Sequence, residues 1–134
     1  MMDDLINILH TGNHSLVVAN GDICTFDRHG IADLYDLLCN DPGFLAGAAI
    51  ADKVVGKGAA ALVILGHVAE LHADIISEAA LEILSQSPVT VSYGQTVPHI
   101  INRAGNGVCP METLCRDCKT AEECLPLICD FMKK

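Results

Sequence analysis

The chain has 134 residues, of which 51% are hydrophobic and 19% are charged. This length and composition predict a single folded domain, residues 1–134, with a buried core, and they argue against disorder. The formal net charge of −9 and the aromatic content of 4% argue against binding to nucleic acid, which normally requires a basic face. A small anion can still bind locally, because Lys53 and Lys57 lie close together in the sequence.

Two features of the sequence bear on its location. It opens with MMDD, which lacks the positive charge of a secretory signal, and its longest apolar run, residues 59–66, is shorter than the roughly 20 residues of a membrane helix. We therefore expect a cytoplasmic protein that does not contact a membrane. In that compartment the seven cysteines are thiols, metal ligands or nucleophiles rather than disulfides, and we expect Cys24 and Cys39 to pack in the core.

The first third of the chain predicts a helix, a hairpin and a second helix. Apolar spacing predicts a helix over residues 3–9. Two β-prone runs on either side of Asn20-Gly21 predict a hairpin, because this pair tolerates the positive φ angles of a tight turn. A second helix over residues 30–40 is expected to end at the Asn-Asp-Pro-Gly sequence that follows.

The middle of the chain alternates between predicted strands and helices. We expect strands over residues 46–55, 68–76 and 88–93, with a helix over 56–67 and another, opened by Ser77, over 77–87. The helix over 56–67 has almost no polar face, which predicts that it is buried against a sheet. This order indicates a three-layer α/β/α sheet whose later strands run parallel, followed by a cysteine-rich helical tail, residues 105–134, packed on it.

The order of elements resembles the cytidine deaminase-like fold. Five segments, TGNHSLVVANG, GIADLYDLL, GAAIADKVVGKGAAAL, VSYGQTVPHIINR and CPMETLC, resemble the bacterial domain-of-unknown-function family 1893. Together they cover most of the chain, from about Leu9 to Cys115. The resemblance implies a deaminase-like fold whose reaction has not been assigned.

The zinc-binding elements of a deaminase are missing from this sequence. Such an enzyme uses a His or Cys and two further Cys to hold zinc, with a glutamate that shuttles protons. Where the resemblance places the His-Ala-Glu element, the chain reads His29-Gly30-Ile31, and where it places Pro-Cys-x-x-Cys, the chain reads Gly56-Lys57-Gly58-Ala59. We therefore expect no cofactor in the deaminase pocket and no zinc-hydroxide deamination.

The glycine-rich stretch after the first predicted strand of the alternating region has two interpretations. Gly56-x-Gly58-x-x-Ala61 matches a dinucleotide-binding fingerprint, and Asp74 follows at about the expected spacing of 20 residues. The stretch is not a Walker A loop, because Lys57 is followed by Gly rather than Ser or Thr. The other interpretation is a turn whose glycines only permit close packing of helix and strand.

An anion-binding cradle is the functional interpretation of this stretch. A helix N-terminus offers unpaired N–H groups and a partial positive charge, and glycines let an anion approach them. We therefore predict a ligand site formed by Asp52, Lys53, Gly56, Lys57 and Gly58, with Lys57 also a candidate catalytic residue. Strand alternation predicts that Lys53 points to the same end of the sheet as Lys57 and that Asp52 points to the opposite face. In the packing interpretation, Lys57 is an ordinary solvated lysine.

The tail carries candidate metal ligands. Cys109, Cys115, Cys118 and Cys124 can supply four thiolates to zinc or to an iron–sulfur cluster, and the Cys-x-x-Cys spacing of the central pair suits chelation. The gaps on either side match no common pattern, however. The alternative is a cysteine-rich helix pair without metal.

Cys109 is also a candidate nucleophile. It precedes Pro110, a residue suited to the first position of a helix, so its thiolate is expected at a helix N-terminus, with His99 as a base. His67 and His72 are expected at strand boundaries.

Three functional hypotheses result. The first is a protein of deaminase-like fold that binds a small anionic metabolite or nucleotide, with Cys109 chemistry. The second is a non-catalytic metal-binding or regulatory module that uses the tail. The third is a dimeric scaffold, since the high hydrophobicity for this length is consistent with a homo-oligomer.

Overall fold

The computed structural model describes residues 2–28, 31–101, 107 and 109–133. These residues form seven helices and five strands, which in chain order are α1 (Met2–Thr11), β1 (Leu16–Asn20), β2 (Asp22–Phe26), α2 (Ala32–Asn40), α3 (Pro42–Leu45), β3 (Ala49–Val55), α4 (Lys57–Leu65), β4 (Glu70–Ser77), α5 (Glu78–Ser85), β5 (Thr90–Val97), α6 (Pro110–Cys115) and α7 (Ala121–Met132). His29 and Gly30, which were predicted to replace a deaminase element, lie outside the described residues.

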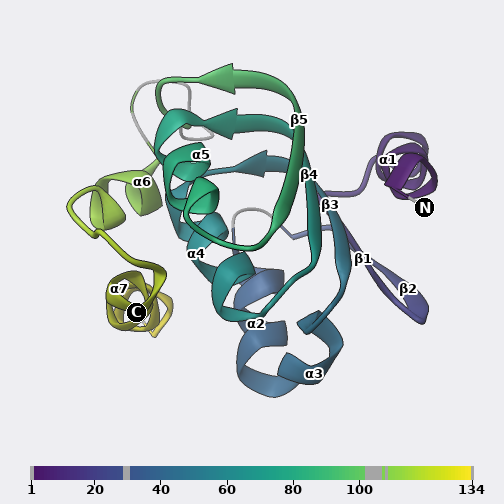
Figure 1. The fold of residues 1–134 in the computed structure, drawn as a ribbon, viewed down its shortest axis with the longest axis horizontal. Coiled ribbons are helices and arrows are strands. Elements are labelled where there is room, and N and C mark those ends of the chain that lie inside the picture. The colour runs from purple at the N-terminus through teal and green to yellow at the C-terminus, as the bar shows by residue number, and fades with distance from the viewer. Residues whose placement is uncertain (1, 29–30, 102–106, 108, 134) are drawn as a thin grey trace.

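The strands form one mixed sheet in the order β2-β1-β3-β4-β5 (Figure 1). β1 is antiparallel to both β2 and β3, whereas β3, β4 and β5 are parallel. The prediction of an N-terminal hairpin followed by parallel strands is therefore confirmed. α4 and α5 supply the crossovers between the parallel strands.

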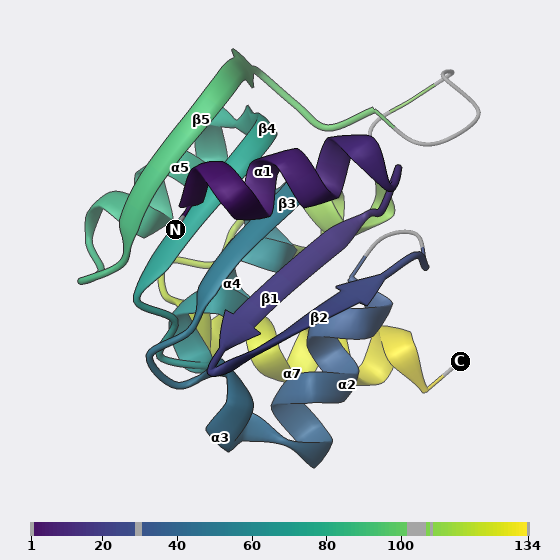
Figure 2. The same cartoon turned by 90° about the vertical axis from the view of Figure 1, so that its right-hand side faces the viewer.

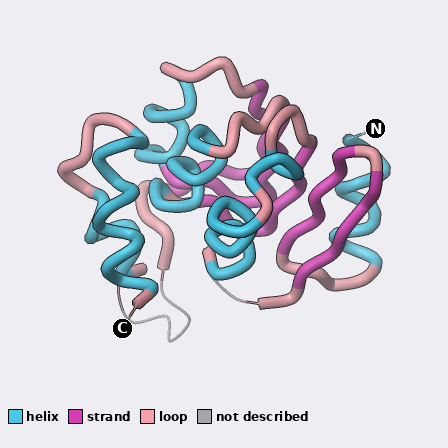
Figure 3. Tube along the Cα trace, turned by 90° about the horizontal axis from the view of Figure 1, so that it is seen from below, coloured by secondary structure: helices cyan, strands magenta, loops and turns pink. Residues whose placement is uncertain are grey.

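The helices are divided unequally between the two faces of the sheet. Figures 1 and 2 show α1 alone on one side, and Figure 3 shows the other helices gathered on the opposite side. Leu5 and Leu9 of α1 pack on Val17, Ala19 and Ala51 in a small core. The larger core lies on the opposite face, around α4.

α4 is the central helix of the larger core. Its residues from Lys57 to Val63 are all buried, as its almost continuous apolar sequence predicts. The tail packs on the same core, to which Cys124 and Ile128 of α7 both belong. α4 therefore lies between the sheet and the tail.

The turn between β1 and β2 depends on a single residue with a positive φ angle. Gly21 has φ +84°, whereas Asn20 remains in β1 and pairs with Asp22. The Asn20 side-chain amide donates hydrogen bonds to the carbonyl groups of Phe44 and Ala46, both at 2.9 Å. The asparagine therefore joins the hairpin to the C-terminal end of α3 instead of supplying a positive φ angle.

The alternation of side-chain directions along two of the parallel strands is interrupted at Lys53 of β3 and Asp74 of β4. The ladder between β3 and β4 skips Lys53 and Asp74, and the core-facing positions of β4 shift from Ala73 to Ile76. In β3, Ile50 and Val55 belong to the same core although they are five positions apart, so side-chain directions extrapolated by strict alternation fail toward the end of this strand.

Other local predictions need correction. The segment after α2 does not simply terminate the helix, because Pro42 begins the short helix α3. Cys39 is exposed rather than packed in the core, and Cys24 is half-buried. His72 lies inside β4 rather than at its boundary. No helix among the described residues has both the length and the apolar character needed to span a membrane.

Candidate functional site

A cavity of about 560 Å³ lies at the carboxyl end of β3. Five residues that the sequence predicts for ligand binding or catalysis line it: Asp52, Lys53, Gly56, Gly58 and Cys109. The rest of its wall is mainly apolar, although Ser15 and the carboxylate of Glu112 also line it; the apolar residues are Ile31, Val54, Ala59, Ile100, Ile101, Pro110, Met111 and Phe131. The size and the apolar character are typical of small-molecule sites.

The N-terminus of α4 is already bound by a carboxylate of the chain itself. Glu112 Oε1 accepts hydrogen bonds from the backbone N–H of Lys57 at 2.7 Å and from the hydroxyl of Ser77 at 3.0 Å. Its Oε2 accepts the N–H of Ile100 at 3.3 Å. Glu112 is only 7% exposed. The predicted position of an anionic ligand is thus occupied by Glu112, and the expectation of an open anion cradle at this helix is wrong.

The two glycines permit the close approach of α6. A Cβ atom on Gly58 would lie 2.4 Å from Cγ of Met111, and one on Gly56 would lie 2.9 Å from Oε1 of Glu112. Real Cβ atoms do not approach other atoms so closely. The packing interpretation therefore explains both glycines without a bound ligand.

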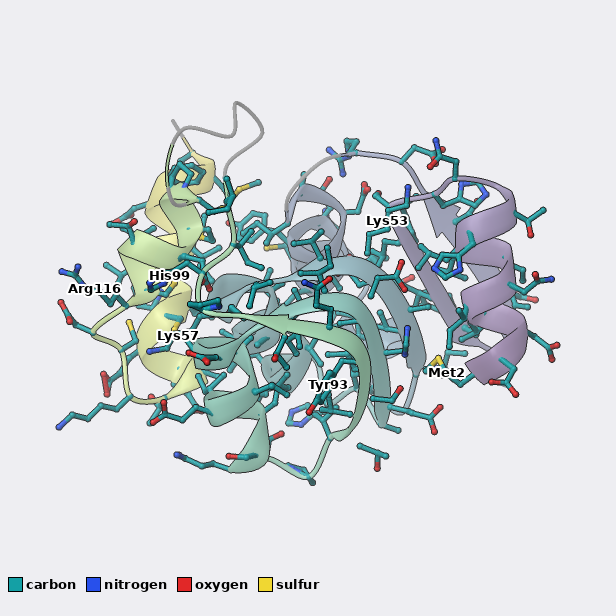
Figure 4. All side chains as sticks on the ribbon, turned by 90° about the horizontal axis from the view of Figure 1, so that it is seen from above. Met2, Lys53, Lys57, Tyr93, His99 and Arg116 are labelled. Carbon is teal, nitrogen blue, oxygen red and sulfur yellow. The ribbon has the colours of Figure 1, made fainter. Side chains whose placement is uncertain are left out.

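Lys57 does not line the cavity. It is only 8% exposed, and its ammonium group donates hydrogen bonds to the carbonyl groups of Arg116, at 3.2 Å, and Cys118. Figure 4 shows Lys57 beside the tail and Lys53 toward α1, so the two side chains point apart. The predictions that Lys57 contacts a ligand with Lys53, and that it is a solvated surface lysine, are both corrected by its burial against the tail.

Asp52 and Lys53 both line the cavity but have different partners. Asp52 lines the cavity together with residues of α4 and α6, whereas the ammonium of Lys53 binds the side-chain oxygen of Asn13, beside α1, at 2.6 Å. Burial raises the pKa of Asp52 to about 7, and the charge of Asp74 acts in the same direction. The hydrogen bond from the N–H of Val54, at 3.3 Å, only partly opposes this increase. Asp52 therefore changes its protonation near neutral pH.

Cys109 lies at the cavity wall, immediately before α6. Pro110 occupies the first position of that helix, as predicted, and the Cys109 N–H donates to the carbonyl of Ile100 at 2.7 Å. His99 is not among the described residues that line the cavity. The pairing of Cys109 with a histidine base therefore stays a prediction without structural support.

The four tail cysteines separate into two groups. Cys109 lines the cavity, whereas Cys115, Cys118 and Cys124 belong to the large core, where the thiol of Cys124 lies against the other two. In the described part of the chain, no group of three or more His, Cys, Asp or Glu side chains is arranged to hold a metal ion. Zinc or iron–sulfur binding by these thiols stays a prediction.

The acidic residue of the apparent dinucleotide fingerprint has other partners. Asp74 binds His10 at 2.7 Å and His72 at 3.3 Å. The contact with His10 connects β4 to α1, on the face of the sheet away from α4. Asp74 therefore does not complete a nucleotide site with Gly56.

Glu112 is the main residue that the sequence did not identify. It stands in an ordinary helical segment, CPMETLC, and its partner Lys57 is 55 positions away. The burial of Glu112 and the three groups that donate hydrogen bonds to it depend on the packing of α6 against α4, which the sequence does not reveal.

The fold and the cavity define an α/β protein with a five-stranded mixed sheet and a candidate small-molecule site at the end of its parallel strands. Residues 4–132 match the TM1506 family, described as domain of unknown function DUF1893, and the chain belongs to that family. The crystal structure of a DUF1893 family protein (TM1506) from Thermotoga maritima is similar to it, with a TM-score of 0.89 and 24% identity over 96% of this chain and 88% of that one. At this identity the likeness concerns the fold. Comparison with curated proteins gives no match.

Proposed function

We propose that this protein binds a small nucleobase-containing metabolite in the cavity at the end of β3, on a deaminase-like fold without the deaminase zinc site. The order of strands and the position of the cavity support this proposal. The cavity is lined by Ile31 at the start of α2 and by Gly56 and Gly58 around the start of α4. These are the two places where the resemblance locates the zinc elements of a deaminase.

The polar groups of the cavity favour a ligand that donates hydrogen bonds. Asp52 is the observation that carries the proposal: it is a half-buried carboxyl group on a mainly apolar wall, and burial raises its pKa to about 7. Perturbed titratable groups in such a cavity are candidates for a functional role. An amino group or ring N–H of a nitrogen heterocycle can donate to the carboxylate, and Phe131 at the wall supplies an aromatic surface.

A small free anion and a nucleotide, the two ligand classes expected from the sequence, are not equally compatible with the contacts at the start of α4. A free anion at the start of α4 has to displace Glu112, which already satisfies three donors. A nucleotide requires no such displacement if its base faces Asp52 and its phosphate lies at the mouth near Lys53. Of the two ligand classes expected from the sequence, the nucleotide is therefore the one we propose.

Calorimetric titration with a panel of nucleosides and nucleotides tests the proposal. Binding is expected to weaken about tenfold or more in Asp52→Asn, because a hydrogen bond to a charged group contributes roughly 1.5–3 kcal/mol. Lys53→Met is expected to weaken the binding of nucleotides but not that of nucleosides. Asp117→Asn and Lys119→Met are matched controls, since both residues lie on the exposed surface of the tail.

Two results would contradict the proposal. One is nucleotide binding that is unaffected by Asp52→Asn. The other is a complex whose anionic group replaces Glu112 at the N–H of Lys57. Such a complex would support the interpretation of the start of α4 as an anion-binding site.

The missing zinc elements give a separate expectation about reaction. Protein saturated with zinc is expected to deaminate neither cytidine nor adenosine, because no glutamate follows His29 and no cysteine stands at the start of α4. Zinc-dependent release of ammonia that disappears in His29→Ala would show that a deaminase site exists.

A further inference from the structure

The two edges of the sheet differ in their protection against pairing with another strand. β2 and β5 are the edge strands, because the order of strands is β2-β1-β3-β4-β5. β2 has five residues, begins at Asp22 and is followed directly by Asp27 and Arg28. β5 has eight residues, TVSYGQTV, and none of them is charged or a proline. Charges and prolines are common protection for an edge strand, so β5 is the less protected of the two.

The uncharged character extends beyond β5 itself. Residues 83–101 contain no Asp, Glu, Lys or Arg, although the whole chain has 17 acidic and 8 basic residues and a net charge of −9. A net charge of this size makes two copies of the chain repel each other over most of their surface. At β5, two copies can meet without placing like charges of the paired strands opposite each other.

The outer side of β5 is open to solvent. Six of its eight residues are exposed, and Tyr93, in the middle of the strand, is 49% exposed. Among the described residues β4 is the only strand that pairs with it, and Figures 1 and 2 show no labelled helix along its outer edge. The outward N–H and C=O groups of an edge strand are a template for pairing with another strand.

The interruption of the ladder at Gly94 determines which side chains of β5 share a face. The core-facing residues of β4 are paired in register with three residues of β5, namely Val91, Tyr93 and Thr96. Side chains paired in register point to the same face of a sheet, so these three lie on the face of α4. Ser92 and Gln95 lie on the other face, where the hydroxyl of Ser92 contacts Nδ1 of His72 at 3.0 Å. Gly94, which the ladder omits, separates the two halves of the strand.

This arrangement suits β5 to a two-fold symmetric, antiparallel pair. With a two-fold axis at the centre of the strand, Val91 of one copy lies opposite Thr96 of the other. Ser92 likewise lies opposite Gln95. Each pair joins residues of the same face, as an antiparallel ladder requires. In a strand with strict alternation, an axis at that point would oppose residues of opposite faces instead.

We propose that β5 is the site at which two copies of this protein pair, antiparallel and about a two-fold axis between Tyr93 and Gly94, into one continuous sheet. Tyr93 of each copy then lies opposite Gly94 of the other and covers the backbone that the glycine leaves bare, as aromatic side chains do beside edge glycines. The outward backbone groups of both strands gain hydrogen-bond partners. Because the other edge, β2, is protected by charge, the self-complementary interface closes at two copies.

Light scattering during size-exclusion chromatography of the full chain tests the pairing. The wild type is expected at twice the 14.2 kDa of one chain. Tyr93→Lys places two ammonium groups close to the two-fold axis, so the dissociation constant of the pair, measured by sedimentation, should rise about tenfold or more. Ile23→Lys is the matched control, because Ile23 lies in the other edge strand and is also 49% exposed. This variant should dimerise like the wild type.

Hydrogen exchange of the wild type gives a second measurement that needs no variant. The outward amides of β5 should exchange more slowly above the dissociation constant than after dilution below it, because pairing gives them hydrogen-bond acceptors. The amides of β2 should show no such dependence on concentration. This comparison decides the question even if Tyr93→Lys does not fold.

Three results would overturn the proposal. One is a wild-type chain that remains monomeric at about 0.5 mM, where even a weak specific dimer is populated. A second is a dimer that Tyr93→Lys leaves intact, whatever the effect of Ile23→Lys, because the interface would then lie elsewhere. A third is growth beyond two copies with rising concentration, because a single unprotected edge is used up in the pair.

Discussion

The carboxylate of Glu112 lies 2.7 Å from the backbone nitrogen of Lys57, and this contact joins the tail to the first turn of α4. A helix N-terminus carries unsatisfied N–H groups and a partial positive charge, so a carboxylate at this point stabilises it. The same carboxylate also accepts hydrogen bonds from Ser77 at the end of β4 and from Ile100. Glu112 therefore holds together four segments that are distant in the sequence.

Replacement of Glu112 by alanine is expected to destabilise the protein strongly. Glu112→Ala leaves three donors without a partner at a buried position, and each such loss costs about 1–3 kcal/mol. We expect the free energy of unfolding, measured by urea denaturation, to fall by about 3 kcal/mol or more. Glu112→Gln keeps one acceptor oxygen and should show an intermediate loss.

The control for this prediction is an exposed glutamate of the same tail. Glu122→Ala removes a side chain at the surface of α7 and should change the free energy of unfolding by less than about 0.5 kcal/mol. Equal stability of Glu112→Ala and Glu122→Ala would show that the contacts of Glu112 do not hold the tail in place.

Gly58 is expected to be intolerant of even a methyl group. Alanine normally favours a helix, but a Cβ at this position would lie 2.4 Å from Cγ of Met111. Gly58→Ala should therefore lower the free energy of unfolding by about 1–3 kcal/mol, as overpacking does. Gly43→Ala in α3, where a Cβ meets no atom within 4 Å, should be neutral or slightly stabilising.

A double-mutant cycle identifies the cause of that loss. If contact with Met111 is responsible, Gly58→Ala should cost less in a Met111→Ala background than in the wild type. An equal loss of unfolding free energy in both backgrounds would instead indicate that the backbone of α4 causes the destabilisation.

Lys57→Met is expected to destabilise the protein, although lysine substitutions at a surface rarely do so. The ammonium is buried and donates to two carbonyl groups, which methionine leaves without a donor. The free energy of unfolding should fall by about 1–3 kcal/mol, whereas exposed Lys119→Met should change it little. A silent Lys57→Met would restore the interpretation of Lys57 as a solvated lysine.

The elements of the fold could be predicted because their signals are local. The apolar sequence of α4 predicts a buried helix, Ser77 accepts the N–H of Ala80 at 3.1 Å as the cap of α5, and Gly21 supplies the positive φ angle of the hairpin. The errors arose where a side chain has a distant partner. Asn20, for example, resembles a turn residue but donates hydrogen bonds to carbonyl groups at the C-terminal end of α3.

The site could be predicted only in part for the same reason. The location at the end of β3 follows from the general preference of ligands for the carboxyl ends of parallel strands, and Asp52 and Cys109 do line one cavity. The direction of Lys57 could not be inferred, because it depends on the docking of the tail. Glu112 carries no local signal, since each of its acceptor contacts joins it to a different segment.

The last prediction concerns the dependence of stability on pH. The pKa of Asp52 is about 7 in the folded protein, against about 3.9 for an ordinary aspartate in an unfolded chain. Between these values the folded state binds the proton that the unfolded state has released, so the contribution of Asp52 to stability falls as the pH rises from about 4 to about 7. Asp52→Asn removes this titration. The free energy of unfolding of the variant relative to the wild type should therefore increase across that interval and become constant above it. Asp117→Asn, whose native side chain is 93% exposed, should give a constant difference over the same interval. A flat difference for Asp52→Asn would mean that Asp52 titrates as an ordinary surface carboxylate and has no special role in the cavity.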